Sequence, residues 1–314
     1  MSPNNTKKIV SNYNVRLDLS LLDSGLSRNV IKKMIKDGLV KVNSNTVRKP
    51  KFKVNKGDSI EYIEFDYNNK DLEILPQKMK LNTIYEDNNV IVINKPEGLV
   101  VHPGAGNPKN TLLNGIIFKL KFNNNLKERP GVVHRLDKNT SGVIIFAKNP
   151  FTLDFLVNQF KSRKVEKKYI VLVKGIVNPK DKKINFIDKK NFFVKGNISR
   201  NKANRKNFVF SENGKESITY FKIVKYINDE FTLLEAYPKT GRTHQIRVSL
   251  ASINHPVIGD KVYSRRYSIS SYPHMFLHAY SLKLEIPDIG LKEFSASLPN
   301  FWNNIPGVMS IYKL

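Results

Sequence analysis

Hydrophobic and polar positions follow two different patterns along the chain and divide it into two parts. Near the start, residues 27–38 carry apolar side chains at helical spacing, and Gly38 follows the last turn. Two short segments with alternating polarity come next, at residues 39–43 and 59–64. This order predicts a small α+β domain over residues 1–64.

From residue 81 onward, strand patterns predominate. Two apolar segments flank a turn at residues 87–89 and predict a hairpin, and a second turn-rich segment at residues 134–142 is expected to lie between two apolar strands. Helices are predicted at 112–120, from Asn149 onward and at 243–254, and long strands at 168–175, 217–226 and 231–238.

These elements predict a second domain at residues 81–314, a mixed α+β fold around a largely antiparallel sheet. The stretch between the two domains, residues 65–80, loses periodicity and contains Asn68, Asn69 and Pro76. We interpret it as a linker. The overall fold class is therefore α+β.

The charge of the chain points to an anionic partner. Lys and Arg number 53 against 27 Asp and Glu, for a net charge of +26, while 40% hydrophobic residues are enough to form a core. There is no cysteine, which excludes disulfides and thiolate metal sites. We find no export signal and no apolar run near the ~18 residues of a membrane span, so we expect a cytoplasmic protein without a membrane partner.

One candidate site lies in residues 131–149. Asp137 is the only carboxylate between Glu128 and Asp154, and Arg135 and Lys138 beside it would favour its ionised form. The alternative interpretation is that Asp137 and the residues after it only build a turn.

A second candidate site lies in residues 237–263. Two of the chain's scarce arginines, Arg242 and Arg247, flank a predicted helix start and could hold a carboxylate or phosphate with two hydrogen bonds each. The alternative is that they face solvent, with Thr243 and His244 serving only as a cap and a first-turn residue.

The N-terminal domain carries Arg28, Lys32, Lys33, Lys36 and Lys41 close together, either as an RNA-contacting surface or as a solvated basic face. Its order of features resembles the ribosomal-protein-S-four-like RNA-binding domain: RLD, SR before a short helix, G-x-V-x-VN, and GD before the last strand. That resemblance implies an RNA partner, with Arg28, Lys32 and Lys33 among the contacts. It implies no particular reaction.

The C-terminal part resembles the RluA/RluD-type pseudouridine synthases. The matching segments occur in family order and are NKPEGLVVHPG, HRLDKNTSG, EKKYIVLVKG, GKESITYFKIV, TGRTHQIRVSLAS, HPVIGDKVY and FLHAYSLKL. The resemblance implies a catalytic aspartate at Asp137, an arginine that displaces the target base at Arg135, a tyrosine against the uracil at Tyr169 and an arginine paired with the aspartate at Arg247.

The same resemblance places His134 and Arg242 among the substrate-binding residues. It implies that the enzyme isomerises uridines of RNA, most often large-subunit ribosomal RNA, as a monomer that needs no cofactor and no metal. Ser249 departs from the pattern, since many relatives have His there.

Four other interpretations remain open. A protein with this fold could bind RNA or assist ribosome assembly without catalysis. An RNA methyltransferase would need a glycine-rich cofactor turn, which we do not find, and a glycosidase would need paired carboxylates. Finally, His274 and His278 have the spacing of a helical metal pair, but no third ligand stands out.

Overall fold

In the computed structural model, the chain forms two compact units, Met1–Glu73 and Ile74–Leu314. The structure describes residues 6–24, 26, 28–63, 74–104, 106–121, 131–201, 203–204, 207–264 and 272–312, without the side chains of residues 28 and 29. Within these ranges, no helix has both the length and the apolar character needed to cross a membrane.

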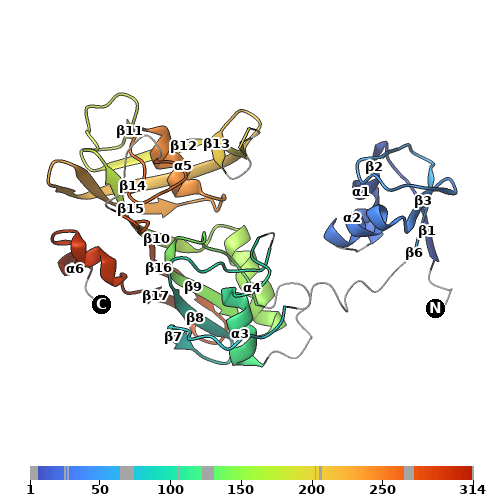
Figure 1. The fold of residues 1–314 in the computed structure, drawn as a ribbon, viewed down its shortest axis with the longest axis horizontal. Helices are drawn as coiled ribbons and strands as arrows, with labels where there is room; N and C mark the ends of the chain where they lie inside the picture. The colour runs from blue at the N-terminus through green and yellow to red at the C-terminus, as the bar shows by residue number, and fades with distance from the viewer. Residues whose placement is uncertain are drawn as a thin grey trace. The chain divides into compact units, whose positions relative to one another are not determined.

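The smaller unit is an α+β fold built on a four-stranded antiparallel sheet in the order β1-β6-β3-β4, with a separate β2-β5 pair (Figure 1). Its elements are β1 (Thr6–Val10), β2 (Val15–Arg16), α1 (Leu17–Ser20), η1 (Leu21–Ser24), α2 (Arg28–Asp37), β3 (Val40–Val42), β4 (Asn45–Thr46), β5 (Lys53–Val54) and β6 (Ser59–Ile63). The predicted helix and the two strands after it are confirmed. Strand β1 was not predicted.

The end of α2 depends on a glycine. Gly38 has a φ of +77°, a conformation that other residues adopt at a cost. The Arg48 guanidinium lies 2.7 Å from the place where a Cβ of residue 38 would be, and it donates a hydrogen bond to the Lys36 carbonyl at 3.1 Å. A side chain at residue 38 would therefore displace the arginine that caps the helix.

The larger unit contains the remaining elements. They are β7 (Thr83–Glu86), β8 (Val90–Lys95), α3 (Leu112–Leu120), β9 (Ser141–Ala147), α4 (Pro150–Lys161), β10 (Glu166–Lys174), β11 (Asn185–Phe186), β12 (Asn191–Arg200), β13 (Phe208–Phe210), β14 (Lys215–Ile227), β15 (Phe231–Pro238), α5 (Gln245–Ser252), β16 (Leu277–Ile286), β17 (Gly290–Ser295), η2 (Asn300–Asn304) and α6 (Val308–Ile311).

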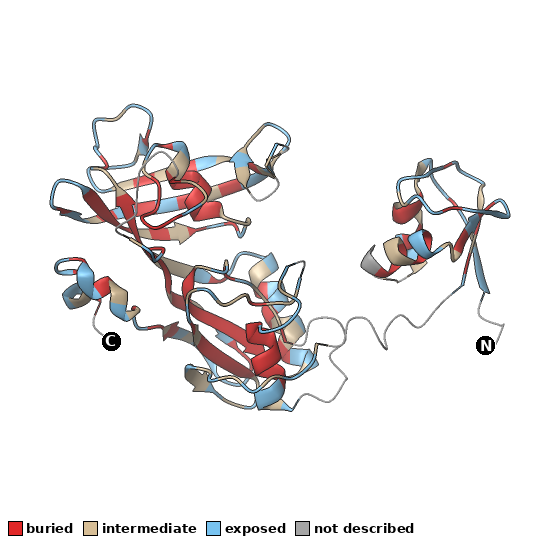
Figure 2. Ribbon diagram, viewed as in Figure 1, coloured by how far each residue is buried: buried red, intermediate tan, exposed pale blue. Residues whose placement is uncertain are grey.

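These strands form one mixed sheet in the order β11-β12-β14-β15-β10-β16-β9-β8-β7, with β13 on β12 and β17 on β16. Among the described strands, only β9 and β16 run parallel, and the other pairs are antiparallel. The largely antiparallel sheet predicted from the sequence is confirmed. Figure 2 shows that buried residues follow the middle strands of this sheet.

Strand β10 separates two cores. Val171 and Val173 belong to the core that contains Leu250 of α5, whereas Ile170 and Leu172 belong to the core of the other face, together with residues of η2 and α6. Helix α4 lies against β9 and β16, while α5 lies against β12, β14 and β15. The sheet is therefore covered by helices on both faces, and α4 and α5 cover neighbouring parts of it.

The strand predicted before residue 134 is wrong. Residues 131–140 make only one isolated bridge, from Val132 to Phe146 of β9. Further along this edge, the N–H of Ile145 donates to the side chain of His134 at 3.1 Å instead of to a neighbouring strand. The His134 side chain thus takes the place of a strand partner for Ile145, and residues 133–140 do not continue as a strand.

The predicted start of the last long helix is also wrong by two residues. His244 has φ 58° and ψ 19°, which is left-handed, so α5 begins at Gln245 and not at Thr243. By contrast, α4 begins as predicted. The Asn149 side chain accepts a hydrogen bond from the Thr152 N–H at 2.8 Å, and Pro150 occupies the first turn.

Candidate active site

Three segments meet at a pocket of about 520 Å³ in the larger unit. Its walls come mainly from the loop before β9, strand β10 and the segment from the end of β15 into α5, and the end of α4 and Leu277 of β16 complete them. Six predicted site residues line this pocket: His134, Arg135, Asp137, Tyr169, Arg242 and Arg247. The other three belong to α2 of the smaller unit, where Lys32 and Lys33 are half-buried. The side chain of Arg28 lies outside the described residues.

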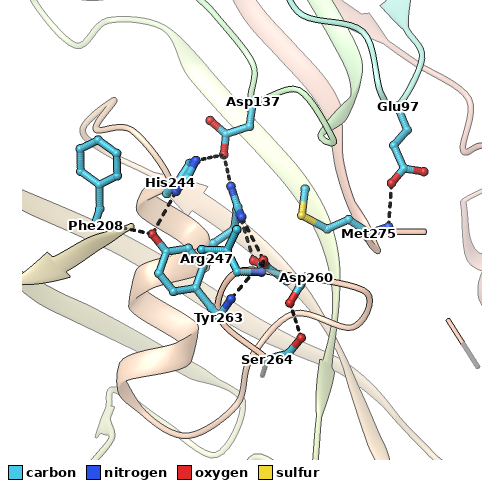
Figure 3. Close-up of polar contacts among 10 residues, drawn as sticks. Glu97, Asp137, Phe208, His244, Arg247, Asp260, Tyr263, Ser264 and Met275 are labelled. Atoms are coloured by element: carbon cyan, nitrogen blue, oxygen red, sulfur yellow. Dashed lines mark hydrogen bonds and ion pairs between the residues drawn. The ribbon is translucent and has the colours of Figure 1, made fainter. Parts of the chain in front are cut away.

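Asp137 is held by a chain of buried charges (Figure 3). Its Oδ2 accepts a hydrogen bond from Nη1 of Arg247 at 3.0 Å. The same guanidinium donates from Nε and Nη2 to both oxygens of Asp260, at 2.7 and 2.9 Å. Arg247 is 6% exposed and Asp260 1%, so both charges depend on this pairing.

The loop around Asp137 is also a turn, because the Thr140 N–H donates to the Asp137 carbonyl at 3.1 Å. Among the described residues, Oδ1 of Asp137 accepts no hydrogen bond. Asp137 can therefore be part of a turn and of an active site at the same time. The backbone forms the turn, and one carboxylate oxygen stays directed at the pocket, where it could attack a substrate.

Tyr169 lines the pocket from β10, where it pairs with Ala236 of β15 and Ala279 of β16. Burial, with a smaller contribution from the charge of Asp137, raises the pKa of Tyr169 well above its ordinary value. The phenol is therefore neutral at physiological pH. It is suited to stacking and to hydrogen bonding, and it is not a ready-made phenolate base.

His134 has a structural partner as well as a place in the pocket wall. Its ring stacks on Phe160 at a centroid distance of 4.7 Å, and Nε2 accepts the Ile145 N–H. Burial, and secondarily the charge of Lys167, lowers the pKa of His134 to about 3. His134 is thus a neutral acceptor that fixes the loop before Asp137.

Another histidine, His278, is fully buried and joins β16 to the start of β9. Its Nδ1 lies 2.9 Å from Oγ of Ser141, and its Nε2 lies 3.0 Å from the Ala296 carbonyl oxygen. Burial lowers the pKa of His278 to about 4. His274 lies before β16 and pairs with Glu97, so the hypothesis of a helical metal pair is wrong. Among the described residues, no cluster of metal-ligating side chains is present.

These two histidines predict acid sensitivity of the larger unit. An unfolded histidine has a pKa of about 6.5. Below that pH the two histidines bind protons in the unfolded chain, whereas His134 and His278 of the folded chain stay unprotonated. Their stabilisation is complete above pH 6.5 and decreases as the pH falls toward the folded values of about 3 and 4. Between pH 7 and pH 5 the free energy of unfolding should fall by about 4 kcal/mol, because each of the two groups contributes about 1.36 kcal/mol for each of the roughly 1.5 pH units below 6.5.

Urea denaturation can measure this fall through the fluorescence of Trp302, the chain's single tryptophan, which is buried in the larger unit. The variant His278→Gln should lose about half of the decrease. A free energy of unfolding that is equal at pH 7 and pH 5 would contradict the prediction.

Sequence reasoning missed four residues around the pocket. His244 lies with Nε2 3.9 Å from Oδ2 of Asp137, and Tyr263 lies under the Arg247 guanidinium at 5.1 Å. Asp260 anchors Arg247, and Lys167 lines the pocket. The only sequence signal for Asp260 and Tyr263 was their place in the HPVIGDKVY segment, which assigned no role to them.

Lys95, in the NKPEG segment, ties the Asp137 loop to β8. It is fully buried, and Nζ donates to the carbonyls of Pro96, Leu99 and Lys138 at 2.9, 2.9 and 3.1 Å. Burial lowers its pKa to about 7, although the charges of Asp137 and Glu97 act in the opposite direction. Gly104 pairs with Asn107 in a tight turn, while Ala105 between Gly104 and Gly106 lies outside the described residues.

Comparison with known proteins finds a matching family for each of the two units. A family model described as RNA pseudouridylate synthase matches residues 89–252, and one described as the S4 domain matches residues 15–60. An uncharacterized RNA pseudouridine synthase of Aquifex aeolicus is 43% identical over 254 residues, covering 80% of this chain and 76% of that protein. Ribosomal large subunit pseudouridine synthase D of Borreliella burgdorferi is 38% identical over 299 residues, covering 91% and 86%.

The fold has a counterpart among solved structures. Human RNA Pseudouridylate Synthase Domain Containing 1 is similar with a TM-score of 0.56 and 25% identity, over 70% of this chain and 84% of that one. The sheet of the larger unit therefore belongs to a known architecture.

Proposed function

Because this chain belongs to the RNA pseudouridylate synthase family, we propose that it isomerises uridines of large-subunit ribosomal RNA and that Asp137 is its nucleophile. The observation that carries this proposal is the contact between Oδ2 of Asp137 and Nη1 of Arg247 at 3.0 Å, in a pocket also lined by Tyr169. We further propose that the chain acts as a monomer, since residues of a single copy already bring Asp137, Arg247 and Tyr169 together in the pocket.

The proposed reaction is an internal rearrangement. The bond between N1 of uracil and C1′ of ribose breaks, the base turns, and a bond forms between C5 and C1′. The proton lost from C5 is balanced by the proton gained at N1. No net oxidation or hydrolysis takes place, so the residues of the pocket need to supply a nucleophile, charge stabilisation and a proton path.

Asp137 must be anionic to attack, so its negative charge needs a fixed positive partner in the pocket. Arg247 supplies the fixed positive charge, and Asp260 holds its planar guanidinium from the other side. The target base must also leave its stack in the RNA, which costs a few kcal/mol. Stacking against Tyr169 can return about 1–3 kcal/mol of this cost.

The direct test is pseudouridine formation by the purified full chain on unmodified ribosomal RNA transcripts, mapped by a chemical adduct. The reaction should proceed in excess chelator with no added cofactor, since nothing in the rearrangement calls for one. The RNA must be shown to stay folded under these conditions. A rate that vanishes in chelator and returns with a divalent metal would contradict the proposal.

Tyr169→Phe separates stacking from proton transfer. The ring is retained, so RNA affinity should stay within about twofold of the wild-type value. The hydroxyl is lost, and as a neutral relay it would assist removal of the C5 proton, so product formation should slow by about 10²-fold. Quench-flow analysis should then show an accumulated intermediate. A Phe variant with the full wild-type rate would leave Tyr169 with only a stacking role.

The smaller unit is proposed to dock RNA through its basic face, which includes Arg28, Lys32 and Lys33. Each phosphate contact releases counterions, so the logarithm of the binding constant should fall linearly with the logarithm of salt concentration. Deleting residues 1–73 should make that slope shallower and weaken binding to long RNA. The pocket residues stay in place, so the single-turnover rate at saturating RNA should remain within about threefold.

Circular dichroism and Trp302 fluorescence establish that the shortened chain is folded. If a folded truncation has lost its rate at saturating RNA, the smaller unit takes part in assembling the active site, and docking and chemistry are not separate.

A further inference from the structure

His244 occupies a strained backbone position at the wall of the pocket. Its φ of 58° lies in the left-handed region, where a side chain with a Cβ is at a disadvantage. Four of the other described residues with such a φ are asparagines, which tolerate it best. A strained residue beside a reactive carboxylate is a reason to look for a role of its side chain.

The contact with Tyr263 favours one position for the ring proton of His244. The Phe208 backbone N–H, which is always a donor, lies 2.9 Å from the Tyr263 hydroxyl oxygen, so that oxygen accepts. Among the described residues, the hydroxyl proton has one acceptor, Nδ1 of His244 at 2.9 Å. Within the described residues, the hydroxyl proton therefore has a partner only if Nδ1 is unprotonated, which favours the neutral ring with its proton on Nε2.

The protonated nitrogen faces the reactive carboxylate. Nε2 lies 3.9 Å from Oδ2 of Asp137, too far for a hydrogen bond and close enough for both groups to reach one ligand (Figure 3). Burial lowers the pKa of His244, and the charges around the ring oppose one another: Asp137 and Asp260 raise the pKa, while Arg247 and Arg135 lower it. At neutral pH the imidazole is neutral and keeps one N–H directed into the pocket.

We propose that His244 donates a hydrogen bond from Nε2–H to a carbonyl oxygen of the target uracil. This proposal rests on the proposed function. If Asp137 attacks C1′, the electron pair of the broken C1′–N1 bond spreads onto both carbonyl oxygens. If Asp137 attacks C6 of the base, the pair moves to the oxygen on C4. In both cases a placed donor stabilises developing charge without giving up its proton.

Two amide variants of different length test the donor. Gln places an amide NH₂ near the position of Nε2, whereas Asn reaches only as far as Nδ1 and leaves the pocket without the donor. His244→Gln should keep the single-turnover rate within about tenfold, and His244→Asn should lower it by about 10²-fold, with RNA affinity changed by less than about threefold in both. Equal rates in the two variants would overturn the proposal.

Tyr263→Phe tests how the ring is oriented. It keeps an aromatic ring under Arg247 and removes only the hydroxyl. Nitrogen NMR of the full chain with labelled histidine reports the tautomer of His244 directly. The wild type should show Nε2–H, and Tyr263→Phe should show a mixture of tautomers with a rate reduced by about tenfold.

The NMR result is independent of catalysis. A wild-type His244 that carries its proton on Nδ1, or is doubly protonated at pH 7, overturns the proposed donor whether or not the chain makes pseudouridine. A chain with the Nε2–H tautomer that makes no pseudouridine in any ribosomal RNA transcript overturns the proposed function, and the donor to uracil with it.

Discussion

Asp137→Asn is expected to lower the single-turnover rate of pseudouridine formation by about 10⁴-fold or more, while RNA affinity changes by less than about threefold. The amide has the shape of the carboxylate but cannot attack as an anion. It can still accept the Arg247 hydrogen bond through its oxygen, so the pocket should keep its geometry. Rapid-mixing assays at saturating RNA measure the rate, and filter binding measures the affinity.

The matched control is Asp154→Asn. Asp154 is an exposed carboxylate on α4 that does not line the pocket, so its rate should equal that of the wild type. If Asp137→Asn retains a rate near that of this control, the nucleophile is another group. If Asp137→Asn still binds RNA but forms no pseudouridine, the wild type and the variant differ only in catalysis. That result would exclude a protein that only binds RNA.

Arg247→Met is expected to have the second-largest effect. Removing the guanidinium should slow the chemical step by about 10²–10³-fold, because Asp137 loses its fixed positive charge. It should also lower the free energy of unfolding by about 3–5 kcal/mol, because the buried Asp260 is left without its partner. Arg247→Lys should recover only part of either loss, since the compact ammonium lacks the planar fork whose three nitrogens reach both oxygens of Asp260 and Oδ2 of Asp137.

A double variant separates these two losses. Arg247→Met combined with Asp260→Asn removes the unpaired charge, so stability should return toward the wild-type value while the rate stays low. Urea denaturation followed by Trp302 fluorescence and single-turnover assays give the two quantities for the same protein. If the rate returns together with stability, Arg247 acts only as part of the scaffold.

The sequence predicts helix ends well where a few adjacent residues determine them. Asn149 before Pro150 marks the start of α4, and Gly38 marks the end of α2, because caps and left-handed positions depend on a few adjacent residues. Strand β1 was not found, since its five residues, TKKIV, are mostly exposed and form a strand only by pairing with β6. The start of α5 was misplaced because His244 carries no signal for its left-handed φ.

The site is harder to predict, since its contacts join distant parts of the chain. Asp137 and Arg247 are 110 positions apart and meet because β9, β10 and α5 come together around one sheet. No periodicity indicates such a contact, and only the family resemblance suggested it. The roles of Asp260, Tyr263 and His244 depend on hydrogen bonds across the pocket, for which the sequence carries no spacing rule.

Conversion of uridine to pseudouridine in large-subunit ribosomal RNA through Asp137 can be measured in cells. Pseudouridines are mapped in that RNA from cells that lack the gene and from the same cells supplied with either the wild type or Asp137→Asn. We predict that one or more pseudouridines disappear on deletion, return with the wild type and stay absent with Asp137→Asn. A map that is unchanged by deletion, or that Asp137→Asn restores, would show that Asp137 is not the nucleophile of a pseudouridine synthase acting on this RNA.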